Sequence, residues 1–456
     1  MPIALWLVVQ SSQVQTILVH RVTTILYNKT GANIKIGAVD FRPFNKILLK
    51  DVFIADLNND TLIYAQRIGL SILNVKINEG TFKLNRVELN QAKINFVTDT
   101  SGVMNLSALL EKISQDTVQE SDSGAFVLKS NRIKITNSTF RLKQIGAPEV
   151  ESGINFEDLY LTNLNIDARN FLISGDTIAL AISQMNFLEQ SGFKLDNFRT
   201  DFSLCSKHLN FGKLRIKAHG SNIKLNHLNM NFNGWEKFGD FVNNVKLDAD
   251  FNNSYLKTNT LTYIIPSLKS VNATVTIDGQ IIGPISNIRG KNIKITTGAQ
   301  TTVSTNFYLT GLPNIDQTLM VVDIKELSTI RNDFKTIKGE DGIKPLIDFP
   351  EELELLGKVT YKGNFTGYLN NFVAFGSINS AIGKIAIDLS FLPDKKQGID
   401  FEGSLDAINL DIGKLAQTDI LGKTTLHAKV KGNADKNANI KAFTDATIKS
   451  LIANSY

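Results

Sequence analysis

The sequence predicts an all-β protein made of one long antiparallel meander. From about Asn33 to Tyr456, apolar residues recur at every second position in short segments, as in KIAIDLSF at 384–391. The segments do not alternate with long helices, as they would in a parallel α/β sheet. A period of two with one apolar side predicts a sheet that is covered on one face only.

The continuous apolar face of this sheet requires a cover, and two arrangements supply one. In an elongated β-taco, or half-pipe, the face lines an apolar groove that takes up hydrocarbon. In a two-layer sandwich, two such faces cover each other. Composition does not separate the two arrangements. For the half-pipe, we expect nine side chains to line the lipid groove: Leu214, Ile216, Ile223, Leu225, Ile293, Ile295, Ile385, Ile387 and Leu389.

Composition and charge narrow the class of protein. The 456 residues are too many for one compact core, and 43% hydrophobic with 20% charged residues is ordinary for a folded chain. The net charge of +5 is spread as isolated lysines without a dense basic block, so we expect no nucleic-acid partner. Cys205 is the single cysteine, which leaves no disulfide framework and no cysteine-based metal cluster.

The chain divides into five predicted parts. Residues 1–31 hold the apolar run PIALWLVV, which looks like the end of a truncated membrane anchor (or a short buried strand), and an amphipathic helix over 11–27. Residues 32–114 form a β module with strands at 33–41, 47–56, 61–72, 82–90 and 92–99 and a short helix near 104–113. Residues 115–124 are a polar linker. Residues 125–344 form a β-taco segment with capping helices, and 345–456 form a further β-taco repeat, truncated at its C-terminus.

Short helices and turns punctuate the strands. We expect capping helices at 235–242, at 328–338 with Ser328 as N-cap, and near 412–415. Asparagine pairs such as Asn252-Asn253 predict hairpin turns, because asparagine tolerates left-handed backbone. The stretches GQIIGPISN (279–287) and GNFTGYLNN (363–371) share one spacing and predict a repeated unit.

Motifs for chemistry are scarce. The sequence has no phosphate-binding loop, no dinucleotide-binding glycine pattern and no HExxH, so we expect no enzymatic activity and no cofactor. The segment from Asp56 to Thr61 has only part of a calcium loop, and an Asx-rich hairpin turn is the favoured interpretation. His208, His219 and His227 fall within 20 residues, but no cysteine or carboxylate pair accompanies them, and we expect no metal site.

One stretch resembles a known family. VELNQAKINFVTDTSGVMNLSALLEKI (87–113) is similar to the N-terminal module of AsmA-like proteins, with Asp99, Gly102 and Asn105 at the D-x-x-G-x-x-N-L turn and Leu109-Leu110 in the helix. Residues 35–65, 185–198, 308–314 and 357–391 resemble the TamB proteins of Bacteroidota, in the same order along the chain.

The resemblance implies a bacterial inner-membrane protein with a single-pass anchor and its bulk in the periplasm. Its role would be outer-membrane biogenesis, by conducting phospholipid acyl chains along a hydrophobic β groove. The alternative is a scaffold for translocation and assembly of outer-membrane proteins with a barrel partner, which would bind through a C-terminal domain beyond Tyr456. A surface adhesin or β-solenoid is a third hypothesis, for which the sequence shows no regular short repeat.

Overall fold

The fold is nearly all β, which confirms the predicted class: strands hold 69% of the residues and helices 11%. The computed structural model describes residues 32–43, 45–76, 80–109, 111, 127–269, 271–335, 351–393, 398–434 and 440–453, together with some positions between 14 and 27. The predicted anchor and the predicted linker at 115–124 lie outside the described residues. The described positions between 14 and 27 are helical, as expected. Within the described part of the chain, no helix combines the length and the apolarity needed to cross a membrane.

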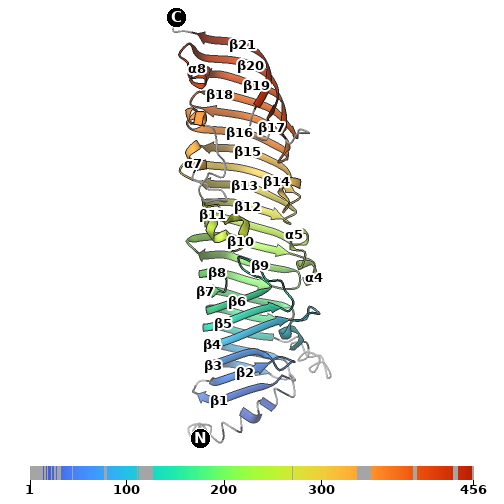
Figure 1. Ribbon diagram of the computed structural model, residues 1–456. Coiled ribbons are helices and arrows are strands. Elements are labelled where there is room, and N and C mark those ends of the chain that lie inside the picture. Colours follow the sequence, from blue (N-terminus) through green and yellow to red (C-terminus); the bar gives the residue numbers. More distant parts are fainter. Residues whose placement is uncertain are drawn as a thin grey trace. The chain divides into compact units, whose positions relative to one another are not determined.

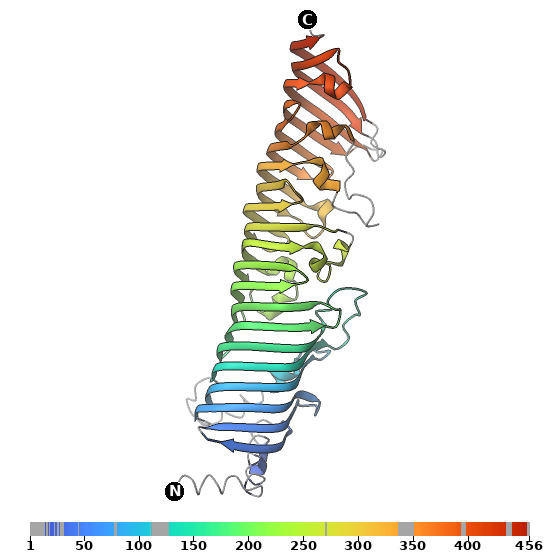
Figure 2. The ribbon, with the colours of Figure 1, turned by 90° about the vertical axis from the view of Figure 1, so that its left-hand side faces the viewer.

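The contacts divide the chain into two units. The first unit comprises Met1–Asn222 and Thr260–Pro266, and the second comprises Ile223–Asn259 and Ser267–Tyr456. In the first unit the strands follow one another in chain order (Figure 2). They are β1 (Ile34–Arg42), β2 (Lys46–Ala55), β3 (Thr61–Lys76), β4 (Thr81–Thr98), β5 (Val127–Gln144), β6 (Asp158–Ser174), β7 (Thr177–Glu189), β8 (Lys194–Leu204) and β9 (His208–Ala218).

The second unit is also a chain-order stack of strands, with short helices beside the strand ends (Figure 1). Its strands are β10 (Ser221–Asn231), β11 (Lys246–Lys257), β12 (Thr274–Gly283), β13 (Asn287–Thr297), β14 (Thr301–Thr310), β15 (Leu319–Thr329), β16 (Val359–Tyr368), β17 (Asn371–Ser380), β18 (Gly383–Pro393), β19 (Ile399–Asp411), β20 (Leu421–Ala434) and β21 (Ile440–Ala453). The helices of this part of the chain are α4 (Trp235–Phe238), α5 (Phe241–Asn244), α6 (Thr258–Leu261), α7 (Arg331–Lys335), α8 (Ile412–Ala416), and the 3-10 turns η2 (Pro266–Leu268), η3 (Ile315–Gln317) and η4 (Glu351–Leu356).

Within β1 to β9, one pairing departs from the predicted antiparallel meander: β4 and β5 run parallel. The register joins Thr81 to Val127 and Thr98 to Gln144. The chain therefore crosses back over the length of a strand between β4 and β5, and helical residues 105–109 lie in this crossover. A parallel pair needs such a long connection, because a tight hairpin reverses the strand direction.

The alternation along the strands is broken at several residues with positive φ. At six of these residues the pairing register shifts, which is typical of a β-bulge, and a buried residue follows. They are Asn137, Asn163, Lys213, Asn253, Asn292 and Asn409. The buried followers are Ser138, Leu164, Leu214, Ser254, Ile293 and Leu410. The prediction of a hairpin turn at Asn252-Asn253 was therefore wrong, because Asn253 supplies the left-handed conformation inside β11 instead.

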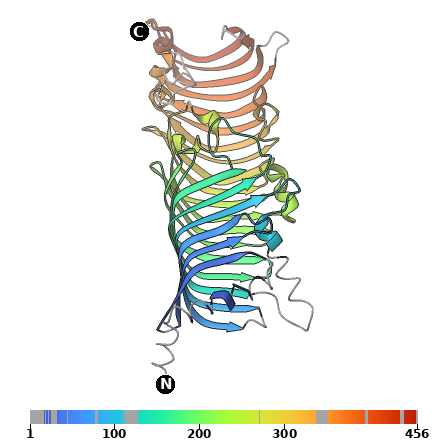
Figure 3. The same ribbon diagram turned by 60° about the horizontal axis from the view of Figure 1, so that its bottom comes forward.

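Buried hydroxyl groups satisfy the backbone at several of these interruptions. Ser138 Oγ accepts a hydrogen bond from Ala92 N at 3.0 Å and donates one to Thr136 O at 2.9 Å. In the second unit, Ser254 Oγ accepts from Lys224 N at 2.9 Å and donates to Lys224 O. Strands β15 to β21 are bowed along their length in Figure 3.

Several predicted boundaries require correction. Strands 82–90 and 92–99 are one strand, β4, because positive-φ Gln91 interrupts the alternation without ending the strand. The predicted helix at 235–242 is two single turns, α4 and α5. Ser328 is not an N-cap, since β15 continues to Thr329 and the helix begins at Arg331. Helix 412–415 is confirmed as α8, which Asp411 caps by accepting a hydrogen bond from Lys414 N.

The predicted repeat corresponds to two similar three-strand segments. Residues 279–287 span the end of β12 and the turn into β13, and residues 363–371 span the end of β16 and the turn into β17. In each segment a third strand follows, β14 or β18, and a Leu-Pro pair stands at or just after its end.

Candidate functional site

The candidate site is the apolar face of the sheet, which each unit builds from cross-strand rows. In the first unit, one row takes a single apolar residue from every strand from β1 to β9. Its members are Val39, Leu49, Ile68, Leu89, Ile135, Ile166, Met185, Phe198 and Ile216. At about 4.8 Å between neighbouring strands, this row is on the order of 38 Å long.

The second unit repeats the arrangement. One row runs from β11 to β21 and begins at the buried hydroxyl of Ser254. It continues through Ile277, Ile295, Val303, Leu327, Tyr361, Ile378, Ile385, Ala407, Leu426 and Ile448. Most of these side chains are half-buried. Their neighbours along the strands are exposed at some positions, such as Lys384, Ala386 and Asp406, and half-buried at others, such as Thr302 and Ser377.

Four phenylalanine rings form a ladder on the apolar face of the second unit. The ring centroids are 4.7 Å apart between Phe365 and Phe372, 4.5 Å between Phe372 and Phe391, and 6.4 Å between Phe391 and Phe401. Each ring comes from a different strand, β16 to β19, and all four are half-buried. The ladder presents a continuous aromatic surface across four strands.

Glycines let aromatic rings lie close to the backbone of this face. A Cβ at Gly290 would stand 2.3 Å from the Phe307 ring, and one at Gly376 would stand 2.6 Å from the Tyr361 ring. Gly432 lies in the same way beneath Phe401. A side chain at these positions would overlap the rings, so glycine allows each ring to lie against the neighbouring strand.

The nine predicted groove residues all lie on the apolar face of their own unit, with Leu214 and Ile216 in the first unit. The second unit holds the other seven, which are Ile223, Leu225, Ile293, Ile295, Ile385, Ile387 and Leu389. Three of the nine are buried: Leu214 is 3%, Leu225 4% and Ile293 1% exposed. These three support the face from within and are not accessible on it, and Leu214 and Ile293 are buried because each follows a bulge. The other six are half-buried.

Short helices pack against parts of the apolar face. In the first unit, Leu106 and Leu109 of the crossover pack with Ile54, Ile63 and neighbouring residues. In the second, Leu356 of η4 and Ile412 of α8 pack with Ile382, Leu410 and Ile385. Ile387 and Leu389 are not among the residues of that cluster.

The D-x-x-G-x-x-N-L motif has a structural role at the start of the crossover. Asp99 Oδ1 accepts hydrogen bonds from Ser101 N, Ser101 Oγ and Val103 N, and these bonds, above all the one from the Ser101 hydroxyl, lower the pKa of Asp99. Gly102 has a φ of 85°. Asn105 Oδ1 accepts from Val97 N at 3.1 Å and from Leu106 N at 2.8 Å. The motif thus fixes the turn and fastens the helix to the sheet.

The side chains of the partial calcium loop and of the three clustered histidines contact other groups of the protein. Asp56 Oδ1 accepts from Asn58 N and Asp60 N at 2.9 Å, which confirms the Asx-type turn. His208 Nδ1 lies 3.1 Å from Cys205 Sγ, His219 accepts from Lys194 N, and His227 lies 3.1 Å from Asp248 Oδ1. Among the described residues, no group of three or more histidine, cysteine, aspartate or glutamate side chains is placed to hold a metal ion.

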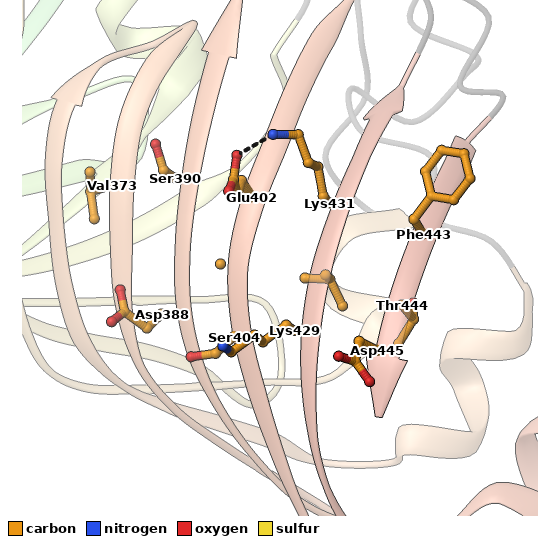
Figure 4. A pocket seen from close by; sticks show the side chains of 12 residues that line it. Val373, Asp388, Ser390, Glu402, Ser404, Lys429, Lys431, Phe443, Thr444 and Asp445 are labelled. Carbon is orange, nitrogen blue, oxygen red and sulfur yellow. Dashed lines mark hydrogen bonds and ion pairs between the residues drawn. The ribbon is translucent and has the colours of Figure 1, made fainter. Parts of the chain in front are cut away.

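A hollow of about 700 Å³ opens on the opposite, polar face of β17 to β21 (Figure 4). Lys431 crosses it to Glu402 at 2.8 Å, and Phe443, which is 82% exposed, stands at its side. The hollow contains none of the nine predicted groove residues. Charges of both signs line it in cross-strand pairs, as is usual on a solvated sheet face.

No protein-family model, curated protein or solved structure matches this chain.

Proposed function

We propose that the protein conducts phospholipid acyl chains along the apolar face, in a half-pipe that leaves this face open as a groove. The observation that carries the proposal is the pair of cross-strand rows of mostly half-buried apolar residues, which run from β1 to β9 in the first unit and from β12 to β21 in the second. In the part of the chain that the structure describes, short helices pack against a few of these residues. An apolar face of this extent favours a hydrocarbon occupant, whereas a soluble scaffold would need only a polar surface.

The apolar face would shield an acyl chain from water and so reduce the free energy needed to move the chain between membranes. An acyl chain of about sixteen carbons costs on the order of 12 kcal/mol to expose, at about 0.8 kcal/mol per methylene. Rows of similar apolar residues offer near-equal sites at each strand, so a chain moves between them without a deep trap. The bulges support the half-pipe, because they bend the strands.

In this proposal the protein is not an enzyme. The resemblance to AsmA-like and TamB proteins supplies the proposed cellular location. It places the chain at the bacterial inner membrane with its bulk in the periplasm, as part of outer-membrane biogenesis. The second candidate, a scaffold for outer-membrane proteins, is favoured by β21, whose Phe443, Ile448 and Ile452 are 82%, 54% and 56% exposed. Such a strand offers apolar side chains to an added client strand.

The test is native mass spectrometry of the chain purified in mild detergent, with extraction of co-purified lipid. The Ile387→Asp variant places a charge on the apolar face, and Ala386→Asp places the same charge one residue away on the exposed face. Lipid is expected with the wild type and with Ala386→Asp, and is expected to be lost with Ile387→Asp. Equal lipid in the two variants contradicts the proposal. Photocrosslinks from β21 to unfolded outer-membrane proteins without lipid would favour the scaffold.

A further inference from the structure

A row of cations crosses the polar face of the first unit. Cross-strand pairing joins Arg42 to Lys46, Lys46 to Ser71, Ser71 to Arg86, Arg86 to Arg132 and Arg132 to Arg169. Five of these six residues are cations, and they come from positions far apart in the sequence. Like charges placed directly opposite each other on a sheet face are destabilising.

The nearby carboxylates neutralise only part of this row. Asp40 lies 3.1 Å from Arg42, Glu88 lies 2.9 Å from Arg86, and Asp167 lies 3.0 Å from Arg132. Lys46 makes none of the ion pairs found among the described residues. The second unit shows the contrasting arrangement, where Glu402 faces Lys431 and Asp406 faces His427 across β19 and β20.

A hollow of about 230 Å³ lies at this row. Gly69 and Ser71 of β3 lie in the hollow between β2 and β4, and the Glu88 side chain lies beside Gly69, with its Oε2 atom 3.4 Å from where a Cβ of residue 69 would stand. Arg42, Lys46 and Arg86 line the hollow together with Glu88. Arg86 Nε is buried and makes no hydrogen bond, since its 2.9 Å contact with Glu88 is an ion pair without hydrogen-bond geometry.

We propose that this hollow binds the phosphate group of a phosphoester, independently of the apolar face. A phosphate group presents several acceptor oxygens, which suits guanidinium groups and an ammonium group arriving from different strands. Ser71 adds a hydroxyl donor at the floor. The headgroup of a phospholipid and a small soluble phosphate share this chemistry, and the test below separates them.

The test uses the full chain with three single variants. Lys46→Glu reverses a charge in the hollow. Gly69→Val fills the hollow without changing any charge, at a position whose backbone is not in the left-handed region. Lys93→Glu is the matched control, since Lys93 is an exposed cation of β4 outside the hollow. The probes are inorganic phosphate and glycerol 3-phosphate by calorimetry, and phosphatidylglycerol vesicles by flotation.

Lys46→Glu and Gly69→Val are each expected to weaken binding at least tenfold, and Lys93→Glu less than twofold. Loss of vesicle flotation in both hollow variants identifies a lipid headgroup as the source of the phosphate. Loss of soluble phosphate binding alone identifies a small molecule. Equal weakening by Lys46→Glu and Lys93→Glu, with Gly69→Val unchanged, would mean diffuse charge attraction and would overturn the site. Absence of binding to every probe by the wild type overturns it as well.

Discussion

Phe372 and Phe391 stack across β17 and β18 with their ring centroids 4.5 Å apart and their planes 22° apart. This pair is the tightest step of the phenylalanine ladder, and Phe401 continues it from the next strand. Both rings are half-buried, so part of each ring stays on the accessible apolar face. The ladder therefore contributes both to sheet stability and to the proposed lipid path.

Removal of one ring tests both contributions. Phe391→Ala is expected to lower the free energy of unfolding by about 1–2 kcal/mol, less than the roughly 3–5 kcal/mol of a fully buried phenylalanine. It is also expected to reduce binding of a fluorescent fatty acid. The control is Phe375→Ala, because Phe375 is 59% exposed and its cross-strand partner is Asp388 on the polar face. Equal losses in the two variants would remove the ladder from the lipid path.

Asn105 is expected to be a stability determinant of the first unit. Its amide donates to Asp56 Oδ2 and to Asn95 O, both at 3.2 Å, and its carbonyl oxygen accepts from Val97 N and Leu106 N. Asn105→Ala leaves these groups without their partner, which costs about 1–3 kcal/mol. Urea unfolding measures the change. Ser107→Ala, at an exposed position of the same helix, is expected to stay close to the wild type.

The bulge at Asn409 gives a prediction about backbone conformation. Asn409 has a φ of 49° and precedes buried Leu410. Asn409→Val puts a β-branched residue in the left-handed region and is expected to cost about 1–3 kcal/mol. Asn409→Gly is expected to change stability by less than about 0.5 kcal/mol, because glycine adopts this conformation freely. Thermal unfolding of the two variants checks the order, and equal melting temperatures would contradict it.

Asp333 makes the stability of the second unit depend on acid pH. It is 4% exposed, and this burial raises its pKa. Hydrogen bonds from Ala299 N, Gln300 N and Thr301 Oγ1 lower the pKa by more, so that it lies below its usual range. A carboxyl group whose folded pKa is depressed stabilises the fold above its unfolded pKa of about 3.9. This contribution is lost as the pH falls through the folded value.

Asp333→Asn is therefore expected to destabilise the protein by about 1–3 kcal/mol at pH 7, and to flatten the decline in stability below pH of about 4. Denaturant unfolding between pH 7 and pH 2 measures both effects. Asp316→Asn, at an exposed position of η3, serves as the control and is expected to retain the wild-type profile. A variant at Asp333 with the full wild-type decline would show that other carboxyl groups cause it.

The two faces of the sheet could be predicted from the sequence, because the period of two assigns each side chain to a face without knowledge of register. Ile385 and Ile387 lie on the apolar face for this reason. Burial at bulges could not be predicted, because a left-handed residue such as Lys213 carries no local signal in its sequence. Leu214 was expected on the accessible surface and is buried for that reason.

The cation row was also hidden from sequence reasoning. Arg86 and Arg132 are 46 positions apart along the chain, and only the parallel pairing of β4 and β5 places them side by side. Lysines and arginines that look isolated along the chain become neighbours through register. The parallel pairing itself depends on a long crossover, which no local pattern of residues specifies.

The parallel pairing of β4 with β5 has a consequence for the kinetics of folding. The other strand pairs from β1 to β9 are antiparallel, so each closes a shorter loop and is expected to form early. The β4–β5 pair must instead bring together segments 46 residues apart. Closing this longer loop costs more chain entropy, and the strand contacts that offset this cost form only afterwards. Pairing of β4 with β5 is therefore expected to be the slow step in the folding of the first unit. Strands β1 to β4 and strands β5 to β9 are expected to form separately before it.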